Sequence, residues 1–126
     1  MKNYLLRSRL ALATILLAVP LCTLSGQSDL ASQKGFTGEV TDTMCAANGS
    51  HASMIAAMPN MGRDGESCTK KCAQLGAKYV LMDSATKTVY QLDDQAKAAQ
   101  FAGRKVKITG TLVGSAIKVA SVNAIG

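Results

Sequence analysis

The sequence is poor in aromatic residues and in histidine. Its 126 residues include no tryptophan, three tyrosines, two phenylalanines and one histidine, His51. It contains no glycine-rich phosphate loop and no dinucleotide-binding fingerprint. Its cysteines form no C-x-x-C pair, which is the spacing found in thioredoxin-like enzymes. These absences argue against nucleotide-dependent and thioredoxin-like catalysis, and we expect a protein that is not an enzyme.

Long apolar runs are absent apart from one near the N-terminus. Three basic residues precede an uncharged apolar run over residues 10–24, which is the layout of a secretory signal peptide. The run is shorter than the roughly 20 residues that span a bilayer. We expect a signal peptide over residues 1–25, cleaved near Ser25 or Gly26, and a flexible leader over residues 26–34. The protein is then exported, to the periplasm or to the medium.

Cys22 lies inside this N-terminal segment. A lipoprotein signal has small residues just before the cysteine that is lipidated, whereas Pro20 and Leu21 stand there. We therefore do not expect a lipid anchor at Cys22. Cleavage near Ser25 removes this cysteine and leaves three in the mature chain.

The basic character of the chain comes largely from the same segment. The chain has 14 basic and 8 acidic residues, and three of the basic ones precede the apolar run, so the mature net charge falls from +6 to +3. Proteins that bind single-stranded nucleic acid combine a dense basic face with exposed aromatic side chains. Four aromatic residues remain, and their apolar neighbours favour a place in the core: Phe36, Tyr79, Tyr90 and Phe101. We expect no nucleic-acid partner.

Alternating and β-branched segments predict a fold that is mainly β. The expected strands lie at residues 35–43, 78–83, 87–92, 104–114 and 116–125. The second and third form one hairpin, the last two form another, and a short helix separates the hairpins. This order is that of a small five-stranded OB-like β-barrel with short helices. An α+β roll of the same strands is the alternative.

The expected domain covers residues 35–126 and carries an insert over residues 44–76. Within the insert, residues 51–58 form about two helical turns and a second helix follows Ser67, which we expect as its N-cap. In the helix between the hairpins we expect Ala96, Ala99 and Phe101 to face inward. In the fourth strand we expect Leu112 to share the inward face with Ile108.

The insert concentrates soft, polarisable side chains. It holds all three mature cysteines, the only histidine and four of the six methionines: Cys45, Cys68, Cys72, His51, Met44, Met54, Met58 and Met61. Thiolate, imidazole and thioether groups are the ligands that Zn(II) and Cu(I) prefer. The pattern C-x5-H-x16-C-x3-C predicts a metal site at Cys45, His51, Cys68 and Cys72, although it matches no standard zinc finger. The methionine spacing is more typical of a packed helix face than of a ligand set.

The runs GEVTDTMC, CTKKC, GAKYVLMD and FAGRKVKITGTLVGSAIKVASV carry a resemblance. They are similar to those of a bacterial family of short exported proteins without an established activity, which share a D-x-x-C opening and a C-x-x-x-C motif. The resemblance covers residues 35–125 and implies an exported protein with an OB-like domain. It implies nothing about a reaction.

Three cysteines are an odd number in a compartment that favours disulfides. Cys68 and Cys72 are one helical turn apart, so a disulfide between them is strained, and Cys45 bonded to Cys68 or Cys72 is the simpler pairing. A metal ion shared by the three thiols and His51 is the second interpretation, and a redox-active thiol pair is the third.

Two functions from different classes follow. The first is an exported, non-catalytic binding module that holds Cu(I) or Zn(II). The second is a disulfide-stabilised structural or interaction domain that contains no metal and binds a protein or saccharide of the cell envelope. The sequence leaves both open.

Overall fold

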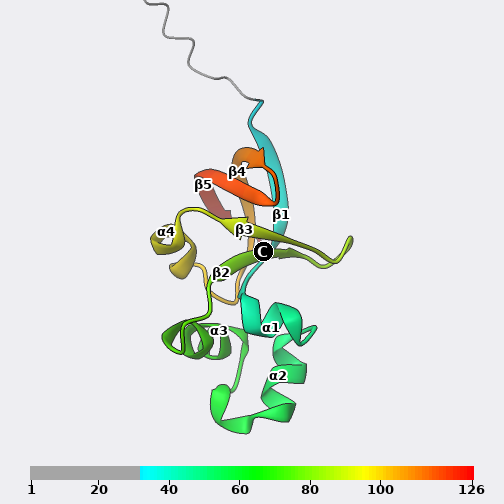
Figure 1. Ribbon diagram of the computed structural model, residues 1–126, viewed down its shortest axis with the longest axis vertical. Helices are drawn as coiled ribbons and strands as arrows, with labels where there is room; N and C mark the ends of the chain where they lie inside the picture. Colours follow the sequence, from blue (N-terminus) through cyan, green and yellow to red (C-terminus); the bar gives the residue numbers. More distant parts are fainter. Residues whose placement is uncertain (1–31) are drawn as a thin grey trace, which may run out of the picture.

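The structure is a computed structural model that describes residues 32–126. The predicted signal peptide and Cys22 lie outside the described residues. Five strands and five short helices follow one another in the order β1 (Lys34–Asp42), α1 (Thr43–Ala47), α2 (His51–Ala57), the 3-10 helix η1 (Pro59–Met61), α3 (Gly65–Gln74), β2 (Tyr79–Asp83), β3 (Thr88–Leu92), α4 (Gln95–Ala99), β4 (Lys105–Val113) and β5 (Ala116–Ala124). The strands occupy the upper half of Figure 1, and α1 to α3 hang below them.

The five strands form one mixed sheet whose pairings run in a cycle, β1-β2-β3-β5-β4, with β4 returning to β1. Four of the pairs are antiparallel, and β3 pairs with β5 in parallel. Strand β1 is shared along its length, because its first half pairs with β4 and its second half with β2. Glu39 lies at the crossover, opposite both Met82 and Lys105. The predicted mainly β fold of five strands and short helices is confirmed at this level.

Both predicted hairpins are present. In the first turn, Asp83 Oδ1 accepts hydrogen bonds from the backbone N–H groups of Ala85 and Thr86, and Lys87 takes a left-handed φ of 57° before β3 begins. In the second, Gly114 supplies a φ of 61° between β4 and β5. The strand and turn signals are local, which is why they could be read from the sequence.

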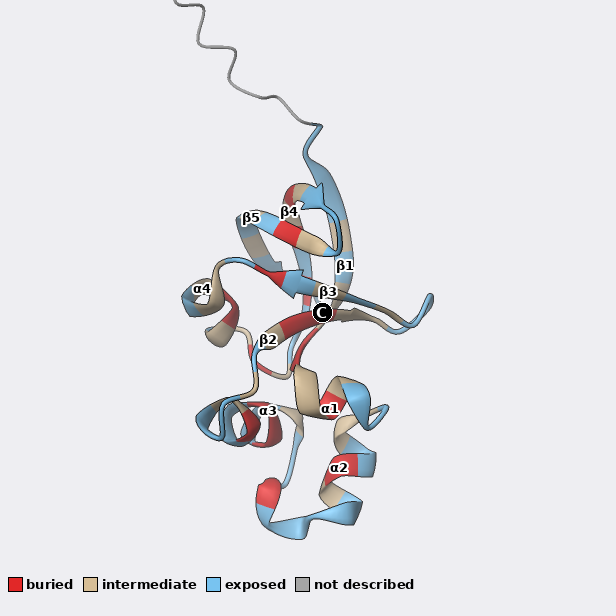
Figure 2. Ribbon diagram, viewed as in Figure 1, coloured by how far each residue is buried: buried red, intermediate tan, exposed pale blue. Residues whose placement is uncertain are grey.

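The sheet encloses an aliphatic cluster, the sheet core, which consists of Val40, Leu81, Leu92, Ala98, Val106, Ile108 and Ile117. Figure 2 shows buried positions on the strands and on α4, separate from a second buried group on the helices below. Phe36 and Tyr90 close one side of the core with an edge-to-face contact, their ring centroids 5.3 Å apart. Both aromatic residues are only partly buried.

The predicted inward face of β4 is wrong at its end. Ile108 is fully buried, but Leu112 is 43% exposed. The pairing between β4 and β5 shifts at Thr109/Gly110, so one strand carries an extra residue there. The extra residue is Ala120 on β5, so β4 keeps its alternation as far as Gly110, which is buried. Leu112 lies beyond this point, near the end of β4.

The helix α3 begins earlier than predicted. Its N-cap is Asp64, not Ser67, and Ser67 is the third helical residue of a capping box. Asp64 Oδ1 accepts from the Ser67 N–H, and Ser67 Oγ accepts from the Asp64 N–H. Both residue types cap helices well, so the spacing alone favoured neither.

Two contacts fix the remaining helices on the sheet. The predicted inward position is wrong for Ala96, which is exposed, whereas Phe101 packs against the sheet core and Ala98 is buried. The Gln95 side-chain amide forms hydrogen bonds with both the N–H and the C=O of Tyr79, which ties α4 to β2.

Gly103 approaches the start of α3 so closely that a Cβ there would lie 2.3 Å from the Glu66 nitrogen.

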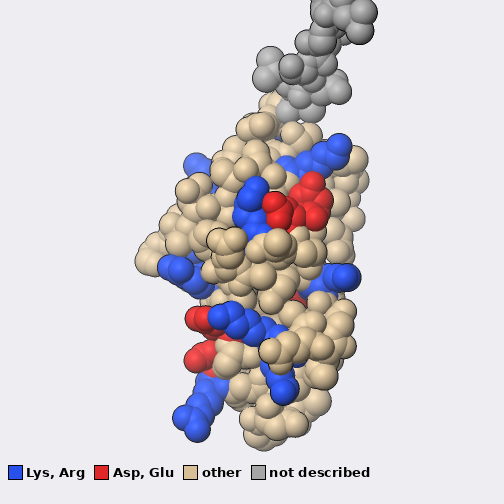
Figure 3. Space-filling view, turned by 90° about the vertical axis from the view of Figure 1, so that its left-hand side faces the viewer, with Lys and Arg blue, Asp and Glu red and all other residues tan. Residues whose placement is uncertain are grey.

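Charged side chains are spread over the surface rather than gathered by sign. The face in Figure 3 carries lysine and arginine beside aspartate and glutamate. None of the helices among residues 32–126 has the length and apolarity needed to cross a membrane.

Candidate metal centre

Below the sheet lies a second buried cluster, made of sulfur-bearing residues. This sulfur core consists of Cys45, Cys68, Cys72, Met54 and Met61, all at most 4% exposed. Met44, Ile55 and Ala77 pack against it. The core therefore joins α1, α2, η1 and α3, which are far too short to be stable alone in water.

The cysteines are positioned by the capping of two helices. Asp42, the last residue of β1, is the N-cap of α1, and its Oδ1 accepts from the N–H groups of Met44 and Cys45 at 2.9 Å each. This turns Cys45 beneath the sheet. Cys68 and Cys72 lie four residues apart on α3, on the face turned toward Cys45.

Cys45 is the centre of the thiol group. Its Sγ lies 3.4 Å from Cys68 Sγ and 3.9 Å from Cys72 Sγ. All three cysteines are free in the structure. A disulfide has sulfurs about 2.05 Å apart, so either predicted pairing of Cys45 needs only a small approach of the two sulfurs. The disulfide stays a prediction.

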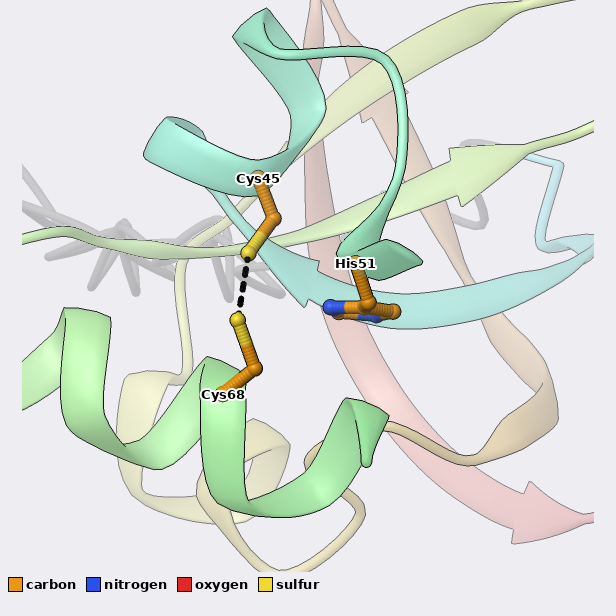
Figure 4. A group of neighbouring side chains, drawn as sticks. All are labelled: Cys45, His51 and Cys68. Atoms are coloured by element: carbon orange, nitrogen blue, oxygen red, sulfur yellow. Dashed lines mark hydrogen bonds between the residues drawn. The ribbon is translucent and has the colours of Figure 1, made fainter. Parts of the chain in front are cut away.

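His51 faces this group from the first turn of α2, as Figure 4 shows for His51, Cys45 and Cys68. Its ring is held at both nitrogens, by Glu39 Oε1 at 2.5 Å from Nε2 and by Thr69 Oγ1 at 3.4 Å from Nδ1. The side chain is only 14% exposed. Gly65 allows the ring to lie against α3, because a Cβ there would be 3.0 Å from His51 Cδ2. A carboxylate behind a histidine is a common arrangement at metal sites, where it fixes the ring.

The predicted ligands fall into two overlapping groups. Cys45, His51 and Cys68 offer ligand atoms that lie within 4.8 Å of one another, and so do Asp42, Cys45 and Cys72. His51 belongs only to the first group and Cys72 only to the second. The structure therefore does not gather the four predicted residues into one set. Cys45 belongs to both groups and is the residue on which any site here depends.

Asp42 is the unexpected member of the site. Its side chain is 0% exposed, and its Oδ2 accepts no hydrogen bond of standard geometry among the described residues. A buried carboxylate without a partner for one oxygen is unfavourable by several kcal/mol, as an order of magnitude, unless a proton or a cation compensates it. The nearest candidates for that compensation are the thiols beside it.

Burial and this carboxylate together raise the pKa values of Cys45 and Cys72. Burial raises the pKa of Cys72 to about 11, and the nearby Asp42 charge adds to the effect. Burial also raises the pKa of Cys45 well above its ordinary range, with Asp42 again contributing. A metal that binds here must displace these protons, so its binding releases protons and strengthens as the pH rises.

The methionines divide between packing and surface. Met54 and Met61 are 4% exposed within the sulfur core, which agrees with the packing interpretation. Met58 is 38% exposed, so the predicted packed face does not include it. Asn48 Nδ2 donates a weak hydrogen bond to Met54 Sδ at 3.9 Å.

Comparison of the chain with protein-family models, curated proteins and solved structures finds no significant match. The resemblance to a family of short exported bacterial proteins therefore stays a prediction. The geometry of the site is therefore the basis for a function.

The sequence singled out the thiols and His51 but not the two carboxylates that accompany them. These two carboxylates are Glu39, which contacts His51, and Asp42, which lies beside Cys45 and Cys72. The D-x-x-C spacing was the available signal for Asp42, since an aspartate three residues before a helical cysteine is placed to cap its helix. Nothing local indicated Glu39, which meets His51 only after β1 and α2 pack together.

Proposed function

We propose that this protein is an exported, non-catalytic module that holds one thiophilic metal ion at the sulfur core. Cys45 is the common ligand, and its close partners are Cys68 and His51 on one side and Cys72 and Asp42 on the other. One observation carries the proposal: Asp42 Oδ2 is buried without a hydrogen-bond partner of standard geometry among residues 32–126, and a carboxylate oxygen of Asp42 lies within 4.8 Å of ligand atoms on Cys45 and Cys72. A cation bound to those thiolates would compensate it.

The donor set suits Zn(II) or Cu(I). Zinc in structural sites takes four thiolate and imidazole ligands, and Cu(I) takes fewer, softer ones. Hard cations such as Mg²⁺ and Ca²⁺ need six or more oxygen ligands, which this core lacks among its described residues. The role we assign is storage, delivery or structural support rather than redox chemistry.

The burial of the thiols supports a role without catalysis. Cys45, Cys68 and Cys72 are 0–1% exposed, so a substrate larger than an ion does not reach them. The raised pKa values of Cys45 and Cys72 also oppose nucleophilic attack, which needs a thiolate. The Glu39–His51–thiol arrangement therefore fits ligand positioning better than covalent catalysis.

We also propose that the sheet is an OB-type barrel and that the protein works outside the cytoplasm. The cyclic strand order and the helix α4 between β3 and β4 support the first statement. The basic and apolar segment at residues 1–25 supports the second.

The short Cys45–Cys68 separation of 3.4 Å favours a second candidate. Oxidation in an exported compartment would convert this pair to a disulfide and leave Cys72 free. The domain would then be a structural or interaction module, with a protein or saccharide of the envelope as its partner and no metal.

Thiol counting and metal analysis separate the two candidates. The mature chain is purified from the periplasm without chelator, its metal content is measured, and its thiols are titrated after denaturation. We expect one ion per chain and three titratable thiols. Cys45→Ser should lose the ion, whereas the control Met82→Leu, on β2, should keep it. A metal-free protein with a single free thiol overturns the metal proposal and supports the disulfide.

A further inference from the structure

A groove on the surface of the insert leads to the sulfur core. It has a volume of about 530 Å³ and is lined by Met44, Ala47, Asn48, Met54, Ala57 and Met58. Three of the six lining residues are methionines, which is half of all the methionines in the chain. Acidic and basic side chains are absent from its lining.

The methionines of this groove include one exposed side chain and two that contact the sulfur core. Met58 is 38% exposed at the outer end. Met54 belongs to the sulfur core at 4% exposure, and Met44 packs against the same core next to Cys45 in α1. The thiols themselves are 0–1% exposed, so an ion that binds them needs an entry path. The thioethers provide one, because a soft ion can pass from one sulfur ligand to the next.

We propose that this methionine groove is the entry path for a monovalent soft ion, Cu(I), into the site at Cys45. This inference rests on the proposed metal-binding function and names the ion. Thioethers are neutral, soft ligands that bind Cu(I) and have little affinity for Zn(II). Copper stays in the +1 state throughout the transfer. Each cysteine that becomes a ligand passes its thiol proton to water.

The test compares loading rates, because the groove contributes to the route and the thiols determine the final affinity. Cu(I) is transferred anaerobically to the reduced mature protein from a coloured Cu(I) chelator, and the loss of colour is followed by stopped-flow absorbance. Zn(II) loading is measured in parallel from a coloured zinc chelator. The variant is Met44→Leu/Met58→Leu, since leucine preserves apolar volume and removes only the sulfur. Met82→Leu, which lies outside the groove, is the matched control.

We expect the double variant to load Cu(I) several-fold more slowly than the wild type, with unchanged final stoichiometry and an unchanged Zn(II) rate. The control should load both ions at wild-type rates. Unchanged Cu(I) loading in the double variant overturns the entry path. Equal slowing for both ions also overturns it, because the groove would then act through packing and not through its thioethers.

Failure of the entry path is distinguishable from failure of the metal site. If wild-type protein takes up Cu(I) and Zn(II) with one ion per chain and the double variant loads normally, the site stands and the route is wrong. If the wild type binds neither ion, both proposals are wrong.

Discussion

The molecule has two cores of different chemistry. The sheet core is aliphatic and is built from all five strands and α4. The sulfur core below it is built from cysteine and methionine on four short helices. Aliphatic side chains stabilise by burial alone, whereas thiols gain most when they bind a metal or form a disulfide. The sheet therefore serves as the scaffold, and the insert is the part whose stability depends on what its thiols bind.

The helices of the insert are too short to be stable without the sulfur core. α1, α2 and α3 have 5, 7 and 10 residues, below the length at which isolated helices persist. Each has a side-chain N-cap, from Asp42, Ser50 and Asp64 respectively. With caps and one small sulfur core as their main support, these helices are the region that a bound ion would stabilise most.

The largest expected effect comes from the sheet core. Ile108→Ala removes a fully buried side chain from the centre of β4, and substitutions of this kind destabilise by about 2–5 kcal/mol. We expect loss of stability of the whole domain, measured by urea unfolding, and the same loss with or without metal. A stability loss that disappears when metal is added would contradict the scaffold role of the sheet.

Metal removal should destabilise the helices around the sulfur core and leave the sheet core unchanged. An ion present at 100 times its Kd stabilises by about 2.7 kcal/mol. We expect a chelator to increase amide hydrogen exchange in α1 to α3 and to leave exchange in β4 and β5 nearly unchanged, measured by mass spectrometry. Uniform exchange increases across sheet and insert would show that the two cores unfold together.

The sheet was largely predictable from the sequence, because its signals are local. The apolar and β-branched runs around Val80 and Val89 and the polar turn between them identify a hairpin without knowledge of the rest of the fold. The bulge at Thr109/Gly110 was not predictable, since it depends on how β4 and β5 pair as the cycle of strands closes. Leu112 is exposed near the end of β4, although Val106, Ile108 and Gly110, which alternate with it along the strand, are buried.

The site was predictable only in its soft side chains. Cysteine is rarely placed without a reason in an exported protein, so its chemistry is visible in the sequence. Carboxylates are common on every surface, and their burial is a tertiary event. Asp42 becomes buried because Cys45 and α3 cover it, and Glu39 meets His51 only across the contact between β1 and α2.

Asp42→Asn tests whether the buried charge matters apart from the cap. Asparagine also caps helices, so α1 should persist, while the negative charge near the thiols is lost. We expect the pKa of Cys72 to fall below about 11, seen as thiolate absorbance in an ultraviolet pH titration of the metal-free protein. Metal affinity should weaken by roughly tenfold, as for other groups that support a ligand set. Asp83→Asn, at the exposed turn, should change neither quantity.

The smallest predicted effect is a difference between the insert and the sheet in how they respond to acid. Asp64 caps α3 in the insert and Asp94 caps α4 beside the sheet, and backbone hydrogen bonds hold the pKa of each carboxyl below its ordinary value of 3.8. A lowered folded-state pKa contributes stability that is present above 3.8 and lost as the pH falls through the folded value. Protonation of Asp64 should loosen α3 before the sheet responds, because the sulfur core gives that helix less support than the sheet gives α4. Amide exchange of α3 and α4, followed by NMR below about pH 5, measures the difference. Asparagine at position 64 still caps α3 but has no carboxyl group to protonate, so Asp64→Asn should remove the acid dependence of exchange from α3 alone. If α3 and α4 still loosen together in that variant, the sheet and not the cap determines the acid stability of the insert.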